Sequence, residues 1–150
     1  RILQHAIRLR DNAKKLSSKD TSAFTLPYDT VWVVFDRDDT TQEHLDSVWN
    51  DARSEKINVA FSQPCFELWL LLHYFYSEKE CSACKEVGKE LLKHDSKYSK
   101  SSTFAEYMPN IADAIKNSQR LHKFAEEQDI KAKSYTTVYK LIEELRKYAD

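Results

Sequence analysis

Glycine is almost absent from this chain of 150 residues, in which Gly88 is the only one. Loops that bind phosphate groups through backbone N–H groups need several glycines, because side chains would keep the phosphate at a distance. The sequence therefore excludes a Walker-type nucleotide-binding loop and a glycine-rich dinucleotide-binding motif. Long apolar runs and the layout of a secretory signal peptide are also missing, so we expect no membrane association.

The chain also has few cysteines and a net charge close to zero. The three cysteines are an odd number, which fits a reducing compartment better than a disulfide framework, so we expect a cytoplasmic protein in which Cys65 is a buried thiol. Cys81 and Cys84 form a C-x-x-C pair without the second pair that is typical of zinc sites. The remaining candidates for zinc ligands are Cys65, His73 and His94. With a formal net charge of −1, any contact with nucleic acid must come from a local basic patch.

An apolar strand that ends in carboxylates is the most informative feature that is present. Residues 31–36 read Val-Trp-Val-Val-Phe-Asp and leave no polar face, which predicts a strand buried on both sides in a parallel sheet. Ligands of such sheets bind beyond the carboxyl ends of the strands, where Asp36 and Asp38 would stand. Two carboxylates at this place predict a site for a hard cation, Mg²⁺ or Mn²⁺. The alternative is a polar loop that caps the next helix through Asp39 or Thr40.

The hydrophobic periodicity predicts one domain over residues 1–150, with an α/β part at 1–76 and a helical part at 77–150. We expect a second strand at 57–62, joined to the first by a right-handed crossover, and a polar loop with Pro27 at 17–29. Pro64 is expected to open the helix after the second strand, which is apolar nearly all round. The expected helices cover residues 2–16, 42–55, 65–76, 81–92, 103–128 with a break near Pro109, and 136–148.

The apolar helix at 65–76 contains two exceptions, Glu67 and His73. Glu67 lies in its first turn, at the sheet edge that Asp36 and Asp38 would share. We interpret Glu67 as a metal ligand or as the general base that activates a metal-bound water. The alternative is a carboxylate that only complements the positive N-terminus of its helix. His73 is expected to be a hydrogen-bonded core residue.

A basic loop with one tyrosine follows the helix at 81–92. It carries Lys93, Lys97 and Lys100, which we expect to contact the phosphates of a nucleic acid. The alternative is a mobile, solvated loop.

Two segments of the chain resemble the RloB-like family, which is found beside restriction and phage-defence loci and often beside an ATPase partner. They are Val31–Asp38 and Ser62–His73, the latter reading SQPCFELWLLLH, and a looser match lies at Tyr135–Leu141. The family is similar to Toprim domains, the metal-dependent catalytic modules of topoisomerases, primases and overcoming-lysogenization-defect nucleases. The resemblance covers residues 30–75 and implies a Toprim-like fold, with a small parallel sheet flanked by helices and a large helical C-terminal portion.

The resemblance also implies a function. Asp36 and Asp38 match the Toprim D-x-D pair, so the family implies a Mg²⁺-dependent nuclease that cleaves DNA or RNA and works with an ATPase partner. Asp36 and Asp38 would hold the ion, and Glu67 would orient or activate water. Toprim domains use a further glutamate after an earlier strand, and no such segment precedes Asp36. We expect it upstream of Arg1, or else the site is degenerate.

Two other functions stay open on the same residues. A non-catalytic subunit would keep the fold and dock on the ATPase partner, and the lack of an upstream glutamate would favour it. A haloacid-dehalogenase-like phosphatase fits the D-x-D-x-T pattern, with Asp36 as nucleophile, Asp38 as acid/base and Ser62 as the phosphate-binding hydroxyl. That family closes its site with a further acidic pair after another strand, and the sequence beyond Phe61 is expected to be helical.

Overall fold

The computed structural model describes residues 2–19, 28–101 and 103–149 of the chain. These residues form two compact units. Unit 1 comprises the described residues up to Val34 together with Thr41–Val59, and unit 2 comprises Phe35–Thr40 together with the described residues from Ala60 onward. The short segment Phe35–Thr40 thus belongs to the unit that is built mainly from the C-terminal part of the chain.

The sheet has three strands in the order β1-β2-β3. The strands are β1 (Trp32–Asp36), β2 (Asn58–Gln63) and β3 (Tyr135–Thr136). The backbone N–H of Asn58 donates to the oxygen of Val31 at 2.9 Å, and that of Arg37 donates to Ser62 at 3.0 Å, so partner residues advance together along a parallel pair. β3 pairs antiparallel with β2. The sheet is therefore mixed, and the prediction of a parallel sheet holds only for β1 and β2.

β1 is exposed on one face, so the prediction of a strand buried on both sides is wrong. The side chain of Val33 is 3% exposed, whereas that of Val34 is 39% exposed. Among the described residues β1 is at the edge of the sheet, and successive side chains of a strand point to opposite faces. Because valine occupies both positions, the sequence shows no alternation that would indicate the solvent face.

Unit 1 contains the two N-terminal helices, α1 (Ile2–Lys19) and α2 (Gln42–Ser54). They are linked by Arg10, whose Nη2 lies 2.7 Å from Oε2 of Glu55. α2 is capped by Thr41, whose Oγ1 accepts a 3.4 Å hydrogen bond from the backbone N–H of His44. The cap therefore lies one residue beyond the predicted Thr40. Most of the predicted loop with Pro27, residues 20–27, lies outside the described residues.

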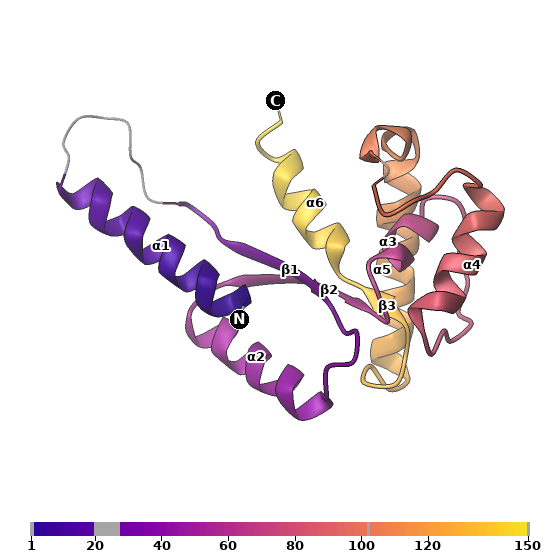
Figure 1. Cartoon of the computed structure of the whole chain (residues 1–150), viewed down its shortest axis with the longest axis horizontal. Helices are drawn as coiled ribbons and strands as arrows, with labels where there is room; N and C mark the ends of the chain where they lie inside the picture. The colour runs from indigo at the N-terminus through magenta and orange to yellow at the C-terminus, as the bar shows by residue number, and fades with distance from the viewer. Residues whose placement is uncertain (1, 20–27, 102, 150) are drawn as a thin grey trace. The chain divides into compact units, whose positions relative to one another are not determined.

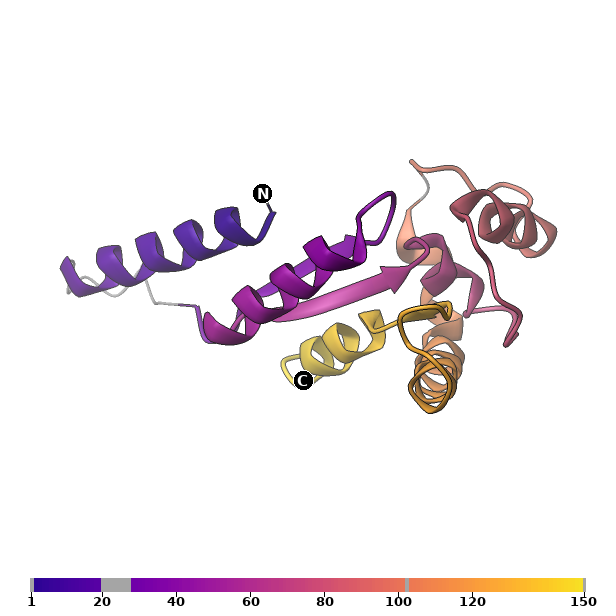
Figure 2. The ribbon, with the colours of Figure 1, turned by 90° about the horizontal axis from the view of Figure 1, so that it is seen from below.

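Unit 2 contains the remaining helices around β3 and the ends of β1 and β2. They are α3 (Glu67–Leu71), α4 (Cys84–His94), the short 3₁₀ turns η1 (Phe104–Glu106) and η2 (Met108–Asn110), α5 (Ile111–Glu127) and α6 (Val138–Arg146). α3 packs against α4 and α5, and α5 also contacts β3 and α6 (Figure 1). Figure 2 shows α5 leading through a loop into β3 and then into α6. No helix of the described residues is long and apolar enough to cross a bilayer.

α3 is much shorter than the helix predicted at 65–76, and it begins three residues after Pro64. Backbone bonds continue for one turn beyond α3, since the N–H groups of Tyr74 and Phe75 both donate to the oxygen of Leu71 at 2.9 Å, and side chains bind other carbonyls of this segment. Nδ2 of Asn117 donates to the oxygen of Leu72 at 2.8 Å, and Nδ1 of His73 lies 2.9 Å from the oxygen of Trp69. With these carbonyls satisfied, the chain can leave the helix after Leu71 although the next side chain, Leu72, stays buried. His73 is 4% exposed, which confirms the prediction of a core histidine.

β3 was not expected, because Thr136 lies within the predicted C-terminal helix. Thr136 is opposite Ser62, and the backbone N–H of the next residue, Thr137, donates to the oxygen of Phe61 at 2.8 Å. The helix begins only at Val138. The expectation of an all-helical chain beyond Phe61 is therefore wrong at this point, where β-branched residues find a partner strand.

Candidate functional site

Asp36 and Asp38 lie together where β1 enters unit 2. Asp36 is the last residue of β1, and its Oδ2 accepts a 3.3 Å hydrogen bond from the backbone N–H of Phe66, directly before α3. The following turn is closed by a 2.9 Å bond from the N–H of Thr40 to the oxygen of Arg37. Asp38 has a φ of 42°, a left-handed conformation that aspartate adopts more readily than most residues. The turn therefore brings the carboxylate of Asp38 close to that of Asp36.

The electrostatic consequence is seen at Asp38, whose carboxyl pKa is raised. The negative charge of Asp36 is the largest cause, followed by partial desolvation and by the charge of Asp39, while Lys100 acts in the opposite direction. Two carboxylates that repel each other favour the binding of a cation, which relieves the repulsion. Their oxygen atoms are the donors that Mg²⁺ and Mn²⁺ prefer.

Both aspartates line a cavity of about 300 Å³ in unit 2, which we call the acidic pocket. The structure also brings Glu67 to this pocket, so the three predicted carboxylates share one cavity. The described residues that line it are Asp36, Asp38, Phe66, Glu67, Leu70, Cys84, Tyr98, Ser99, Lys100, Phe104 and Tyr107. The structure therefore places the predicted acidic residues together, while their chemical role stays a prediction.

Glu67 is the first residue of α3, and both of its oxygens have neighbours from elsewhere in unit 2. Oε1 accepts a 3.1 Å hydrogen bond from the hydroxyl of Tyr98, and Oε2 lies 3.3 Å from Sγ of Cys84. Burial, followed by the charge of Glu67, raises the pKa of Tyr98 to about 12, so this hydroxyl stays a donor at neutral pH. Glu67 is thus held at the pocket wall in a defined orientation.

Tyr98 and Tyr107 are site residues that the sequence analysis did not identify. The hydroxyl of Tyr107 donates a 2.7 Å hydrogen bond to Oδ2 of Asp95, and Oδ1 of Asp95 accepts a 3.1 Å bond from the N–H of Lys97. These bonds hold the loop after α4 against the pocket. The tyrosine in the basic loop was the available signal, but its partner could be found only from the structure.

The three predicted phosphate-binding lysines do not form one patch. Lys100 lines the acidic pocket and is the single cationic side chain that the described residues contribute to it. Lys93 instead lies 2.6 Å from Oε2 of Glu90 and lines a different cavity. Lys97 is exposed and lines neither of these two cavities. Only Lys100 is therefore placed to meet a phosphate that enters the acidic pocket.

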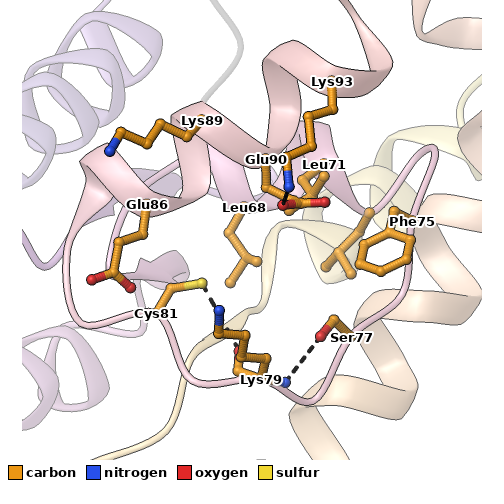
Figure 3. Close-up of a pocket in the computed structure, with 11 residues that line it drawn as sticks. Leu68, Leu71, Phe75, Ser77, Lys79, Cys81, Glu86, Lys89, Glu90 and Lys93 are labelled. Atoms are coloured by element: carbon orange, nitrogen blue, oxygen red, sulfur yellow. Dashed lines mark hydrogen bonds and ion pairs between the residues drawn. The ribbon is translucent and has the colours of Figure 1, made fainter.

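The second cavity, of about 420 Å³, is larger and has an apolar floor, and we call it the apolar pocket. Leu68, Leu71 and Phe75 line it, and the charged side chains of α4 lie along one side of it (Figure 3). Those charged residues alternate in sign along α4 and include an ion pair between Lys93 and Glu90. The apolar pocket therefore offers no concentrated charge for a cation or a phosphate.

Ser62, the phosphate-binding hydroxyl of the phosphatase alternative, is not brought to the acidic pocket. It is 1% exposed, and its Oγ lies 2.8 Å from Oγ1 of Thr136 within the sheet. A hydroxyl that is committed to β3 cannot also hold the phosphate of a substrate next to Asp36. This placement counts against the phosphatase chemistry.

The cysteines are arranged differently from the expectation. Cys65 and Cys84 form a disulfide across a Cα–Cα distance of 5.5 Å, so the prediction of a free thiol at Cys65 is wrong. Cys81 is the free cysteine and lines the apolar pocket. The C-x-x-C pair therefore does not act together, because α4 begins at Cys84 and carries it towards α3.

One family model matches the chain, that of the RloB-like proteins, over residues 2–145. The match includes the turn with Asp36 and Asp38, the start of α3 and the loop with Lys100. No curated protein and no solved structure matches the chain at a significant level.

Proposed function

The chain belongs to the RloB-like protein family, and from this membership and the acidic pocket we propose a Mg²⁺-dependent nuclease with a Toprim-like site that cleaves phosphodiester bonds of DNA or RNA. The observation that carries the proposal is that Asp36, Asp38 and Glu67, which come from two strand ends, line one cavity of unit 2. The raised pKa of Asp38 supports it, because carboxylates in mutual repulsion are typical of functional sites.

In this proposal Asp36 and Asp38 hold the ion. Their oxygens are hard donors, and the pocket contains one lysine to offset their charge, so a divalent cation fits the residues present. When bound, Mg²⁺ would polarise the scissile phosphate and stabilise the charge that develops on it.

The other pocket residues act on the substrate and on water. Lys100 attracts the phosphate by its charge. Glu67 orients the attacking water and accepts its proton, and Tyr98 keeps the Glu67 carboxylate oriented through the hydrogen bond to Oε1. Phe66 positions Asp36 through its backbone N–H. The protein thus supplies positioning, charge and a base.

The cellular context is proposed from the family alone. We expect an ATPase partner, a role in phage defence or restriction, and a cytoplasmic location. Because thiols are kept reduced in the cytoplasm, a cytoplasmic location requires that the Cys65–Cys84 disulfide can be reduced to two thiols.

A cleavage assay tests the nuclease. The full chain is incubated with supercoiled plasmid and with tRNA, in Mg²⁺, Mn²⁺ or EDTA. We expect metal-dependent cleavage that falls by at least about 100-fold in the double variant Asp36→Asn, Asp38→Asn. Asp39→Asn is the matched control, because Asp39 neighbours the pair but does not line the pocket. Cleavage that persists in EDTA or in the double variant would overturn the proposal.

A non-catalytic binding subunit is the second candidate. It is compatible with the acidic pocket, whose aspartates can bind a metal ion whether or not a substrate is cleaved. A chain that binds Mg²⁺ at the aspartates, associates with an ATPase and cleaves neither substrate would support this candidate over the nuclease.

A further inference from the structure

Three potential metal ligands gather where α3 and α4 begin. Sγ of Cys65, a carboxylate oxygen of Glu67 and Sγ of Cys84 lie within 4.8 Å of one another. Cys65 and Glu67 flank the start of α3, and Cys84 begins α4, the helix that packs on α3. Two contacting helix starts therefore hold the three side chains in place.

The orientation of Glu67 points to the cysteines as well as to the acidic pocket. The hydroxyl of Tyr98 occupies Oε1, which leaves Oε2 beside Sγ of Cys84 at 3.3 Å. Cys65 is 1% exposed, whereas Cys84 is half-buried and lines the acidic pocket. A solute that enters the pocket thus reaches the cluster through Cys84.

The cluster differs chemically from the aspartate pair. Thiolates are soft ligands that select Zn²⁺, whereas carboxylates without sulfur suit Mg²⁺ and Mn²⁺. Two thiolates and one carboxylate, with water in the fourth position, form a tetrahedral donor set of the kind that Zn²⁺ accepts. The cluster and the aspartates therefore do not compete for the same ion.

We propose that Cys65, Cys84 and Glu67 form a redox-gated Zn²⁺ site, closed while the two cysteines are joined in the disulfide and open when they are reduced. The reductant is a low-molecular-weight thiol. Two of its molecules supply two electrons and two protons, become one disulfide, and leave two cysteine thiols in the protein. Binding of Zn²⁺ then releases the two thiol protons and gives two zinc–thiolate bonds. The site shares Glu67 with the proposed nuclease, whereas Cys65 and Cys84 have no part in that function, so Zn²⁺ binding is tested apart from cleavage.

Cobalt provides the direct test, because Co²⁺ bound to thiolates gives a sulfur-to-metal charge-transfer absorption. The full chain, reduced by a phosphine under anaerobic conditions, is titrated with Co²⁺ and then with Zn²⁺. We expect one Co²⁺ per chain with this absorption, displaced by Zn²⁺ but not by excess Mg²⁺. The oxidised chain should show none. Absence of the absorption in the reduced chain would overturn the proposal.

Matched variants locate the site. Cys84→Ser should abolish the absorption, and Cys81→Ser, which removes the cysteine outside the cluster, should leave it unchanged. Glu67→Gln should keep the absorption but raise the Kd for Zn²⁺ by at least about tenfold. The double variant Asp36→Asn, Asp38→Asn should bind Zn²⁺ like the wild type. Equal losses in Cys81→Ser and Cys84→Ser would refute the assignment.

A second measurement needs no variant and so does not depend on how Cys84→Ser folds. The reduced wild type is alkylated with iodoacetamide, with and without Zn²⁺, and each cysteine is followed by mass spectrometry. Zn²⁺ should slow the modification of Cys84 at least tenfold and leave the rate at Cys81 unchanged. Equal rates at Cys84 with and without Zn²⁺ would refute the site.

Discussion

The acidic and the apolar pockets share one short helix, because α3 contributes residues to both. Glu67 and Leu70, three positions apart, line the acidic pocket, whereas Leu68 and Leu71 line the apolar one. The apolar pocket is the larger of the two, at about 420 Å³ against about 300 Å³. The smaller one nevertheless contains the three carboxylates of Asp36, Asp38 and Glu67, and Asp38 has a raised pKa there because of its neighbour Asp36. The difference between the two pockets therefore lies in how their charges are arranged and not in their volume.

The sharpest test of this difference removes two negative charges from each pocket. Asp36→Asn with Asp38→Asn should abolish the heat of Mg²⁺ binding in calorimetry, because the ion loses its two oxygen ligands. Glu86→Gln with Glu90→Gln removes the same charge from the apolar pocket and should leave the Mg²⁺ affinity unchanged. Equal losses in both double variants would mean that net charge, and not a site, attracts the ion.

The two faces of α3 should separate stability from function. Leu71 is 5% exposed, so Leu71→Ala should lower the free energy of unfolding by about 2–5 kcal/mol, through lost burial and the cavity left behind. Glu67→Gln should leave the melting temperature of the metal-free chain nearly unchanged but reduce turnover. It should also reduce the Mg²⁺-induced rise in melting temperature, because the pocket loses one negative charge. Thermal melts with and without Mg²⁺ measure both effects. An identical Mg²⁺-induced rise and an unchanged turnover in Glu67→Gln would together make Glu67 a structural residue.

The lysines of the two pockets should differ in their effect on nucleic-acid binding. Lys100→Gln should reduce the slope of log K against log salt by about one unit, because one phosphate contact is lost. Lys93→Gln should leave the slope unchanged, since Lys93 is paired with Glu90 beside the apolar pocket. Fluorescence anisotropy with a labelled oligonucleotide between low and moderate salt measures the slope. Equal slopes in all three proteins would remove Lys100 from the binding surface.

The smallest expected effect concerns the pH dependence of stability at Asp38. Its folded-state pKa is raised, chiefly by Asp36, so the charged carboxylate destabilises the metal-free fold above its ordinary pKa of 3.8, and this cost disappears as the pH falls below that value. Asp38→Asn should therefore raise the melting temperature at neutral pH and have less effect in acid. Asparagine also tolerates the positive φ of this position. A gain that is equal at both pH values would exclude the electrostatic cause.

The sequence predicted the parts of the site that depend on local patterns. The apolar run before Asp36, the crossover helix and the second strand follow from periodicity within about thirty residues, which is the length of a βαβ unit. The two strand ends then bring Asp36 and Glu67 into one unit. Local patterns were therefore enough to predict that these carboxylates lie close together.

The parts of the fold that the sequence did not predict depend on contacts between residues that are far apart in the sequence. β3 has two residues and becomes a strand only because Ser62, 74 positions earlier, offers a partner. The disulfide joins cysteines that are 19 positions apart, whereas the sequence suggested the C-x-x-C pair. The end of α3 depends on Asn117 from α5. None of these partners leaves a periodic signal near the residue that it controls.

The division of the chain into units has a consequence for the order of assembly during synthesis. Phe35–Thr40, with both aspartates, belongs to a unit whose sheet is completed by Tyr135–Thr136, a segment that is synthesised much later. Contacts of such large sequence separation are slow to form, because a long loop must close first. The two aspartates therefore reach their final environment only after Tyr135–Thr136 has been made, and a shorter nascent chain carries them without the complete unit around them.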